Sequence, residues 1–327
     1  MNNRYQKGTA LILVLLVVAF VSALGVTSVD RLHYEIKKSL DNSLKQQAFW
    51  YALGLESKAI DFLKDRHQTI TFSSDLLIDQ TLPSIIVKLE EGEVEGTLFD
   101  LRTCFNLNGI VKYEGDNKLV SNQVGVQQYH NLLSALNIDA LDQEQLIYSL
   151  IDWIDSNDFA EDTSGAEDDF YTRLDSPYRT PNQVIFNIQE LINIKHYGHQ
   201  KVDLLSPFIC ALPIAGNTEI NINAIPKNKP QILVMLFGDQ LNLNSASNVL
   251  ADRPMDGFKD KEEFLSHPDL SNLRLANSTI ESISFKSEFY KLRTKVKNKN
   301  YPFILESTLH IMESGEVKVI SRSEGVF

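Results

Sequence analysis

The amino-acid sequence predicts an α+β protein in which a long N-terminal helix packs on an antiparallel sheet and a large all-α domain is inserted between the strands. Residues 9–65 contain no proline and keep apolar side chains at helical spacing, which predicts one continuous helix. Residues 84–113 and the chain after Ile283 alternate or run apolar between turn residues, as short strands do. Between these two regions the apolar residues fall at helical spacing. Strands, then helices, then strands indicate one domain that carries a helical insertion.

The first part of the long helix has the length and composition of a membrane span. Residues 9–29 form a stretch of 21 residues without a charge, and a helix of that length spans about 30 Å of hydrocarbon. Arg4 and Lys7 precede it, and the positive-inside bias keeps this basic end in the cytoplasm. We therefore expect the bulk of the chain to lie outside the cytoplasm.

Two interpretations of this segment compete. A basic start, an apolar run and small residues ending near Ala23 are also features of a secretory signal peptide, which would be cleaved and lost. Against cleavage, the apolar run continues to Val29 and the chain beyond it keeps a helical period. The residues of that period are Leu32, Ile36, Leu40, Leu44, Ala48, Ala52, Leu55, Ala59 and Leu63. Such a helix has one apolar stripe to lay against a sheet, but the residues alone leave both interpretations open.

The remaining elements follow in chain order. Glycines at positions 92, 96 and 109 punctuate the first strand region. Helical spacing predicts helices within residues 127–154 and around 187–194, 231–237 and 245–250. Alternation predicts strands at residues 290–296, 303–311 and 316–321, with a turn at 313–315.

Charge and cysteine content exclude several classes of function. The 327 residues include 31 Lys and Arg against 43 Asp and Glu, and a net charge of −12 argues against binding nucleic acid by neutralising phosphates. Residues 222–250 have a faint helix-hairpin-helix character, but their surroundings lack a basic excess. The two cysteines form no Cys-x-x-Cys pair, so zinc ribbons, zinc fingers and iron–sulfur sites are excluded.

Cys104 and Cys210 flank the inserted helices, and a disulfide between them would clamp the base of the insertion. Closing a loop of about 100 residues is worth several kcal/mol in the chain-entropy model. Two buried free thiols are the alternative. An oxidising compartment favours the bridge, and we expect it.

Five cations share one face of the late strand, because they alternate with other residues along it. They are Lys291, Arg293, Lys295, Lys297 and Lys299. Lysines that guard a solvated edge are the simpler interpretation, and contact with an acidic partner is the other.

An acidic cluster lies between residues 152 and 175 and contains one cation, Arg173. Its nine carboxylates are Asp152, Asp155, Asp158, Glu161, Asp162, Glu167, Asp168, Asp169 and Asp175. Charge runs are usually solvated, but here Trp153 and Phe170 are among apolar residues that would pin the loop to a core. Pinned carboxylates need a counterion, and a loop that offers only oxygen ligands favours a hard cation such as Ca²⁺. The spacing is not that of an EF-hand, because Ala160 stands where the required glycine would be.

An enzyme is the rival explanation of the acidic cluster. Two carboxylates about 5–9 Å apart could act as general acid and nucleophile in a glycoside hydrolase. No further feature supports this hypothesis, because the sequence lacks Gly-x-Ser-x-Gly, His-Glu-x-x-His and phosphate-binding glycine loops.

The segment Lys-Gly-Thr-Ala-Leu-Ile-Leu at residues 7–13 resembles the prepilin-peptidase site of type IV pilins and type II secretion pseudopilins. In that family cleavage follows the glycine, here Gly8, so the mature chain would begin at Thr9 and keep its apolar helix. The family usually has a glutamate at the fifth mature position, where this chain has Leu13. Among pseudopilins, the K type lacks this glutamate and is the tip subunit.

Further segments resemble general secretion pathway protein K, the K-type pseudopilin. These are Ala-Phe-Trp-Tyr-Ala-Leu-Gly at 48–54, Cys-Phe-Asn-Leu-Asn at 104–108, Leu-Ile-Asp-Trp-Ile-Asp at 150–155, Gly-Ala-Glu-Asp-Asp-Phe-Tyr at 165–171, Pro-Tyr-Arg at 177–179, Ala-Leu-Pro at 211–213 and Ile-Asn-Ile-Asn-Ala at 220–224. Their order and spacing cover most of the chain and make the resemblance specific.

The resemblance implies a domain layout and a metal site. Residues 1–8 would be the prepilin leader, 9–29 the transmembrane helix, 30–112 and 283–327 the two parts of a pilin-like domain, and 113–282 the inserted helical domain. It also implies Ca²⁺ in the inserted domain. We assign its ligands to Asp155, Asp158, Glu167, Asp168 and Asp169.

The resemblance further implies a minor pseudopilin at the tip of the type II secretion pseudopilus, a structural component of protein export across the outer membrane. Expected partners are other minor pseudopilins, the prepilin peptidase that leaves a methylated Thr9, and the inner membrane, but no nucleic acid. The bulk of the chain would lie in the periplasm. The alternatives left open are a membrane-anchored periplasmic hydrolase, a helix-hairpin-helix-type binding protein and a soluble protein released by signal cleavage.

Overall fold

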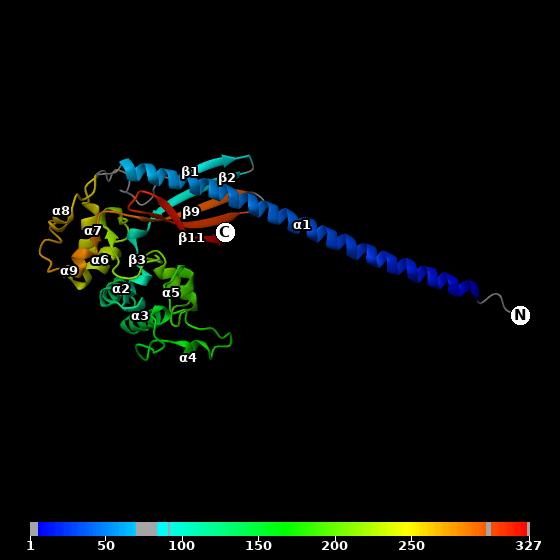
Figure 1. The fold of residues 1–327 in the computed structure, drawn as a ribbon, viewed down its shortest axis with the longest axis horizontal. Helices are drawn as coiled ribbons and strands as arrows, with labels where there is room; N and C mark the ends of the chain where they lie inside the picture. Colours follow the sequence, from blue (N-terminus) through cyan, green and yellow to red (C-terminus); the bar gives the residue numbers. More distant parts are fainter. Residues whose placement is uncertain (1–5, 70–83, 91, 299–301, 326–327) are drawn as a thin grey trace.

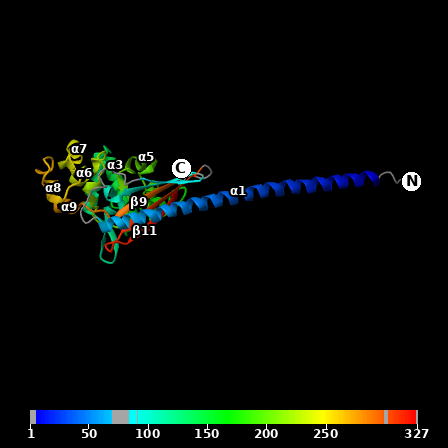
Figure 2. The same ribbon diagram turned by 90° about the horizontal axis from the view of Figure 1, so that it is seen from above.

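A computed structural model describes residues 6–69, 84–90, 92–298 and 302–325 and shows a long helix, an antiparallel sheet and a helical lobe (Figure 1). Residues 1–5, which include most of the expected leader, lie outside the described residues. Helix α1 (Gln6–Thr69) projects far from the rest of the molecule, and only its C-terminal part lies on the sheet (Figure 2). The predicted α+β fold class is therefore confirmed.

The main sheet has five antiparallel strands in the order β1-β2-β9-β10-β11. Their bounds are β1 (Ile85–Leu89), β2 (Gly92–Asp100), β9 (Phe289–Asn298), β10 (Phe303–Ile311) and β11 (Val317–Gly325). Strands β2 and β9 pair with Val94 opposite Val296, so segments from both sides of the insertion meet in the sheet. Along β10 every second side chain is buried, as expected for a sheet covered on one face.

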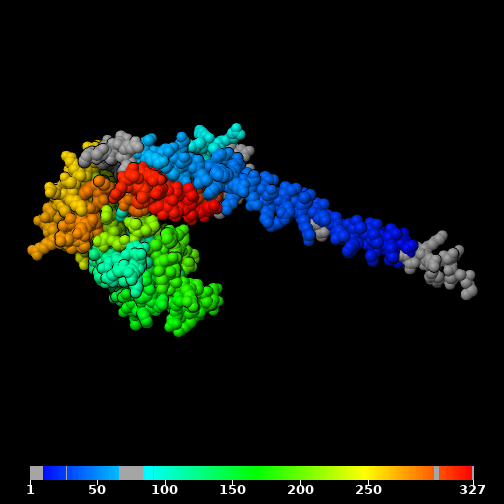
Figure 3. Space-filling model, in the orientation of Figure 1, coloured from blue at the N-terminus to red at the C-terminus, as the bar shows by residue number. Residues whose placement is uncertain are grey.

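The second half of the predicted apolar period covers the sheet. The residues of α1 buried there are Ala48, Ala52, Leu55, Ala59 and Leu63. Gly96 on β2 permits the close approach, because a Cβ at this position would lie 2.4 Å from Leu55 Cδ2. The first half of the period, including Leu32, Ile36 and Leu40, is exposed because α1 has left the sheet (Figure 3).

The N-terminal part of α1 has the composition of a membrane span. Within the described residues, this is the one helix long and apolar enough to cross a membrane, with a window of mean hydropathy 2.8. Its large apolar side chains are exposed where the structure describes them, and Leu11 and Phe20, for example, are each 64% exposed. This part of the helix therefore presents an uncharged, mostly apolar surface outside the folded body.

A buried carboxylate fixes α1 to strands β10 and β11 of the sheet. Glu56, 4% exposed, accepts hydrogen bonds from Ser307 Oγ at 2.6 Å and from Arg322 Nε at 2.9 Å and Nη2 at 2.8 Å. Ser307 and Arg322 are directly paired residues of β10 and β11. Burial raises the pKa of Glu56, but the hydrogen bonds from Arg322 and Ser307 outweigh it and the net pKa is lowered. The carboxylate therefore stays ionised at neutral pH.

The cations of β9 are engaged by carboxylates on neighbouring strands. Lys297 Nζ lies 2.9 Å from Glu93 and 2.8 Å from Glu95 of β2. Lys291 and Arg293 both contact Glu306 of β10, whereas Lys299 lies outside the described residues. The expectation that these cations guard a sheet edge is wrong, because β9 is the central strand and pairs with β2 on one side and β10 on the other. The cations instead form cross-strand pairs within the sheet, which accounts for them without an acidic partner.

The helical lobe consists of two consecutive units joined to the sheet by the 3-10 helix η1 (Leu101–Thr103). The first unit contains β3 (Phe105–Asn106), η2 (Leu107–Ile110), β4 (Val111–Glu114), β5 (Lys118–Ser121), α2 (Gln123–Ala135), α3 (Ala140–Ile154), α4 (Asp168–Tyr171), η3 (Ile188–Asn193), α5 (Gly198–Leu205) and β6 (Ile209–Cys210). The second contains β7 (Ile220–Asn221), η4 (Ile222–Ala224), α6 (Gln231–Phe237), η5 (Gly238–Gln240), α7 (Leu243–Ala251), α8 (Lys261–Leu265), α9 (Asn277–Glu281) and β8 (Ile283–Ser284).

The two units repeat one plan. Each opens with a short strand that pairs in parallel with the short strand closing the same unit, β3 with β6 and β7 with β8. Asn108 exchanges two side-chain hydrogen bonds with the backbone of Ile185, and Asn223 does the same with Phe258. The repeat has only a weak signal in the sequence, because the units share a few asparagines and not a run of identical residues.

The lobe begins earlier in the chain than expected. Strand β3 and helix η2, which fall within residues 30–112, pack in one apolar core with α2, α3 and α6 and do not join the five-stranded sheet. Phe105 stacks on Tyr129 of α2 with ring centroids 4.9 Å apart. The apolar character of residues 104–111 therefore reflects the core of the lobe.

Candidate functional site

The acidic loop starts at the end of a buried helix. Asp139 is the N-cap residue of α3, and its side chain accepts a hydrogen bond from the Asp142 N–H. The last turn of the helix is buried through Trp153 and Ile154. Asp155 is the C-cap residue. The ring of Trp153 packs edge-on against Tyr171 at 5.3 Å, so the two ends of the acidic loop are pinned to one aromatic cluster.

Two carboxylates of the expected metal site are buried together. Asp155 is 0% and Glu167 5% exposed. Burial is the main cause that raises the pKa of Asp155 to about 7 and that of Glu167 to about 8, and repulsion from neighbouring carboxylates raises both further. Asp152 repels both residues, and Asp155 and Asp158 repel Glu167.

Three other expected ligands lie farther out. Asp158 is exposed and accepts a hydrogen bond from Asn182 Nδ2 at 3.1 Å. Asp168 is half-buried, and its Oδ1 accepts from the N–H and hydroxyl of Thr180. The side chain of Asp169 is 96% exposed and pairs with Arg173 at 3.8 Å. The structure therefore brings Asp155 and Glu167 together, leaves Asp158 and Asp168 at the rim, and turns Asp169 away.

The oxygen ligands of the acidic loop suit a hard cation, although the carboxylates are not drawn together as they would be around a bound ion. Within the described ranges, no three His, Cys, Asp or Glu side chains are grouped closely enough to hold a metal ion. Glu167 Oε1 is nevertheless buried without a hydrogen-bond partner, an arrangement that costs free energy unless a cation or proton compensates it. The ligands offered are all oxygens, which is the chemistry that Ca²⁺ prefers. By this criterion Asp155 and Glu167 fit the ion, whereas Asp169 does not.

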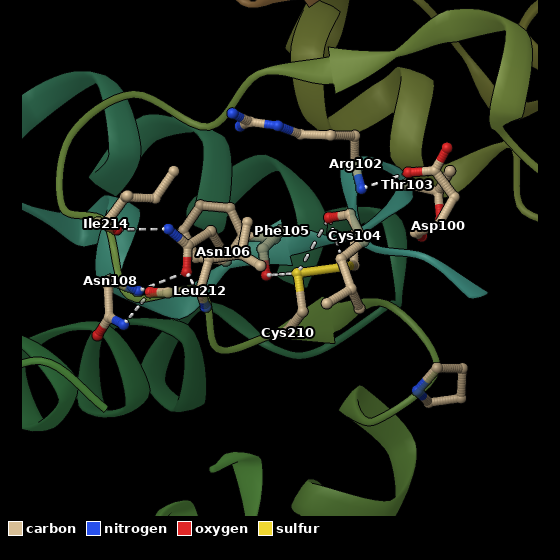
Figure 4. Close-up of a disulfide and its surroundings, with 12 residues drawn as sticks. Asp100, Arg102, Thr103, Cys104, Phe105, Asn106, Asn108, Cys210, Leu212 and Ile214 are labelled. Carbon is tan, nitrogen blue, oxygen red and sulfur yellow. Dashed lines mark hydrogen bonds between the residues drawn. A yellow bond between two sulfur atoms is a disulfide. The ribbon is translucent and has the colours of Figure 1, made fainter. Parts of the chain in front are cut away.

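Cys104 and Cys210 form a disulfide at the junction of sheet and lobe (Figure 4). Their Cα atoms are 5.8 Å apart, and both side chains are buried, at 7% and 3% exposure. The bond joins the start of β3 to the end of β6. It lies in an apolar cluster with Phe289 of β9, so it ties the first unit of the lobe to the sheet.

Two asparagine side chains near this bond fix the chain that follows it. Asn106 accepts a hydrogen bond from the Leu212 N–H at 3.0 Å and donates to Ile214 O at 2.7 Å (Figure 4). Asn108 donates to Leu212 O at 2.7 Å. These contacts hold residues 211–214 against β3, where the chain passes from the first unit to the second.

The processing segment lies at the opposite end of the molecule. Gly8 and Thr9 fall in the first turns of α1, where the helical backbone is described but the side chains are not. The glycine therefore directly precedes the apolar stretch of one uninterrupted helix.

Sequence reasoning missed the residues that hold the acidic loop in place. Asn182 and Thr180 reach it from more than ten residues away in sequence, and Lys195 donates to Gly165 O at 3.0 Å. Polar residues far along the chain carry no local signal of such contacts. The two Asn-x-Asn segments at 106–108 and 221–223 were a visible signal of the repeat, but only a comparison of the two would have revealed it.

An apolar N-terminal helix that runs on to cover an antiparallel sheet defines a pilin-like subunit, here with a large helical insertion. Family models described as type II secretion system protein K match residues 103–214 and 220–286. The chain therefore belongs to the type II secretion system protein K family, and its role is that of a minor pseudopilin in protein secretion.

Individual relatives extend over nearly the whole chain. Type II secretion system protein K of Pectobacterium carotovorum is 29% identical over 98% of this chain and 97% of its own length. The protein of the same name from Klebsiella pneumoniae is 31% identical over 83% of this chain and 82% of its own. A chain from the crystal structure of the GspK-GspI-GspJ complex of enterotoxigenic Escherichia coli superposes with a TM-score of 0.73 at 25% identity, covering 89% of this chain and 100% of that one.

Proposed function

We propose that this chain is the tip subunit of a type II secretion pseudopilus, anchored in the inner membrane with its sheet and lobe in the periplasm. The observation that carries the proposal is the position of the second unit of the lobe. Helices α7, α8 and α9 lie at the end of the molecule opposite the N-terminus of α1 (Figure 1). A subunit added above this end would collide with the lobe. Leu13 also lacks the carboxylate with which a subunit would pair with the one above it.

The proposed partners are other minor pseudopilins, and the chain acts as a structural subunit rather than an enzyme. The similar solved chain belongs to a complex with GspI and GspJ, which supports a hetero-oligomeric tip. On this chain Leu32, Ile36 and Leu40 form an exposed apolar stripe on α1 that neighbouring helices would cover. Trp50, 68% exposed, extends the apolar surface beside the sheet.

Stoichiometry tests the tip assignment. Complexes formed with the other minor pseudopilins should contain one copy of this chain by native mass spectrometry. A strain that lacks the chain should initiate fibres poorly. Several copies along one fibre, or normal initiation without the chain, would refute the tip position while leaving the family assignment intact.

Processing after Gly8 tests the membrane proposal. Gly8→Leu should block cleavage by the prepilin peptidase, because the enzyme must accommodate the backbone just before the apolar helix, and the precursor should accumulate in the inner membrane. Gly25→Leu is the matched control, since it makes the same replacement in the same helix where nothing lies within 4 Å. Mass spectrometry of the wild-type protein should find a methylated Thr9 at the mature N-terminus. A mature chain that starts near Leu24 would instead indicate signal-peptide cleavage.

The acidic loop is proposed to bind Ca²⁺ through Asp155 and Glu167, with Asp158 and Asp168 at the rim. The bound ion would supply the positive charge that these carboxylates lack. A ligand that binds only the folded state raises its stability by about 2.7 kcal/mol at 100 times the dissociation constant. The melting temperature of the full chain in detergent should therefore rise with Ca²⁺ and fall with chelator, and Glu167→Gln should remove most of the increment. Asp175→Asn, which removes an exposed carboxylate, should not; identical curves with calcium and chelator would rule the site out.

A further inference from the structure

The last turns of α3 direct two buried polar side chains at the acidic loop. Ser149 and Asp152 lie three residues apart, on one face of the helix, and both are 0% exposed. Asp152 Oδ1 accepts a hydrogen bond from the Glu161 N–H at 3.0 Å, and its Oδ2 accepts from the Ala166 N–H at 2.7 Å. Ser149 Oγ donates to Ser164 O at 3.3 Å. One carboxylate thus holds two points of the loop that are five residues apart.

The loop is held from its other side as well. Lys195 Nζ donates to Gly165 O at 3.0 Å and lies 4.8 Å from the centre of the Phe170 ring. Glycine is required at position 165 for the loop to approach Asp152, because a Cβ there would lie 2.0 Å from Asp152 Oδ2. Residues 161–166 are therefore fixed between α3 and the segment after η3.

The two carboxylates that fit the cation are adjacent to this contact. Asp155 follows Asp152 by three residues at the end of α3, and Glu167 directly follows Ala166. Glu167 Oε1 is buried without a hydrogen-bond partner. Each oxygen of Asp152 accepts a hydrogen bond from a backbone N–H group, and these two bonds suit the residue to orient the loop.

From this geometry we infer that Asp152 is a positioning residue for the divalent-cation site. By holding the backbone at Glu161 and Ala166, it sets the distance between Asp155 and Glu167 before the ion arrives. Carboxylates that repel one another would otherwise separate, and the ion would have to draw them together. The inference rests on the proposed calcium site and adds the residue that preorganises it. Residues that orient metal ligands typically contribute 10- to 100-fold to metal affinity.

Calcium and terbium titrations of the full chain in detergent test this role. Asp152→Asn keeps the size of the side chain but turns an NH₂ group toward one of the two N–H donors. We expect its dissociation constant for Ca²⁺ to rise about 10- to 100-fold with unchanged stoichiometry. Tb³⁺ is the spectroscopic probe, sensitised by Trp153, and its emission at saturation should match the wild type because the ligands remain. Asp175→Asn removes the same charge from an exposed position and should bind like the wild type.

Gly165→Ala provides a second variant that leaves every carboxylate in place. Its Cβ should displace Asp152 Oδ2 and weaken binding in the same way. If the wild type binds calcium and both variants bind equally well, the positioning role is refuted and the calcium site stands. If Asp152→Asn loses the saturated Tb³⁺ emission or the stoichiometry, Asp152 is a ligand and the inference is wrong. If the wild type binds no calcium, the proposed site itself fails.

Discussion

The Glu56 contact predicts how strongly helix α1 is held on the sheet. Glu56→Gln keeps the shape of the side chain and an acceptor for Ser307. It removes the negative charge that accepts two hydrogen bonds from Arg322. Removing one partner from a fully buried ion pair costs about 3–5 kcal/mol. The Arg322 side chain is 45% exposed and regains water, so we expect a loss nearer to that of one charged hydrogen bond, about 2 kcal/mol.

The measurement is urea-induced unfolding of the full chain in detergent, together with amide exchange of residues 48–63. Glu324→Gln is the matched control, because Glu324 pairs with Lys45 at 2.9 Å across the same helix and strand but both side chains are nearly half exposed. We expect the control to change stability by less than about 0.5 kcal/mol.

The pH dependence provides a second check. The pKa of Glu56 is lowered in the folded protein, so its contribution to stability is present above its ordinary pKa of 4.5 and is lost as the pH falls through the lower folded value. The difference between wild type and Glu56→Gln should therefore shrink in acid. A variant as stable as the Glu324→Gln control at neutral pH would refute the reasoning, as would a difference that does not change down to pH 3.

Three further predictions concern the lobe. Replacing both cysteines of the disulfide, whose separation is 106 residues, should lower the free energy of unfolding by about 4.7 kcal/mol in the chain-entropy model; a loss below about 1 kcal/mol in a urea titration would contradict that estimate. Gly125→Ala should destabilise the lobe by about 3 kcal/mol or more, because its Cβ would lie 1.8 Å from Gly109 O, whereas Gly54→Ala on α1 has nothing within 4 Å and should be neutral or stabilising in the same assay. In chelator, Glu167→Gln should melt at a higher temperature than the wild type at pH 9, because folding raises the pKa of Glu167 from 4.5 to about 8 and the glutamine mimics its protonated form. The difference in melting temperature should disappear as the pH falls through 8 towards 4.5. A difference that is independent of pH would contradict the raised pKa of Glu167.

The sequence predicted those parts of the fold that repeat with a local period. Helix α1, where it lies on the sheet, and strands β9 and β10 follow the apolar spacing of their own residues, because one face of each of these elements is buried. Strands β3, β6, β7 and β8 of the lobe have two residues each and no period to detect. Their pairing depends on asparagine side chains such as Asn108, whose partner Ile185 lies 77 residues away.

The candidate site was predicted in composition but not in geometry. The acidic cluster and its aromatic anchors are visible in the sequence, and so is the preference for oxygen ligands. Which carboxylates turn inward depends on the path of the chain after the α3 C-cap, where no periodicity applies. Asp169 lies on the exposed side of the short helix α4, and Asp152 was counted with the other acids because its backbone partners are 9 and 14 residues away.

The disulfide also decides how the protein responds to mechanical load. A pull applied between α1 and the strands that follow the lobe would pass from η1 across the bond between Cys104 and Cys210 and continue at residue 211. The two cysteines are 106 residues apart in sequence, and the chain between them would reach about 360 Å if it were unfolded and fully extended. While the disulfide is intact, this segment carries no load and does not extend. The second unit contains no cysteine, so its opening and closing strands, β7 and β8, are held together by non-covalent contacts alone. Under tension the second unit is therefore the part of the lobe that opens first, and the first unit, with the acidic loop, is spared.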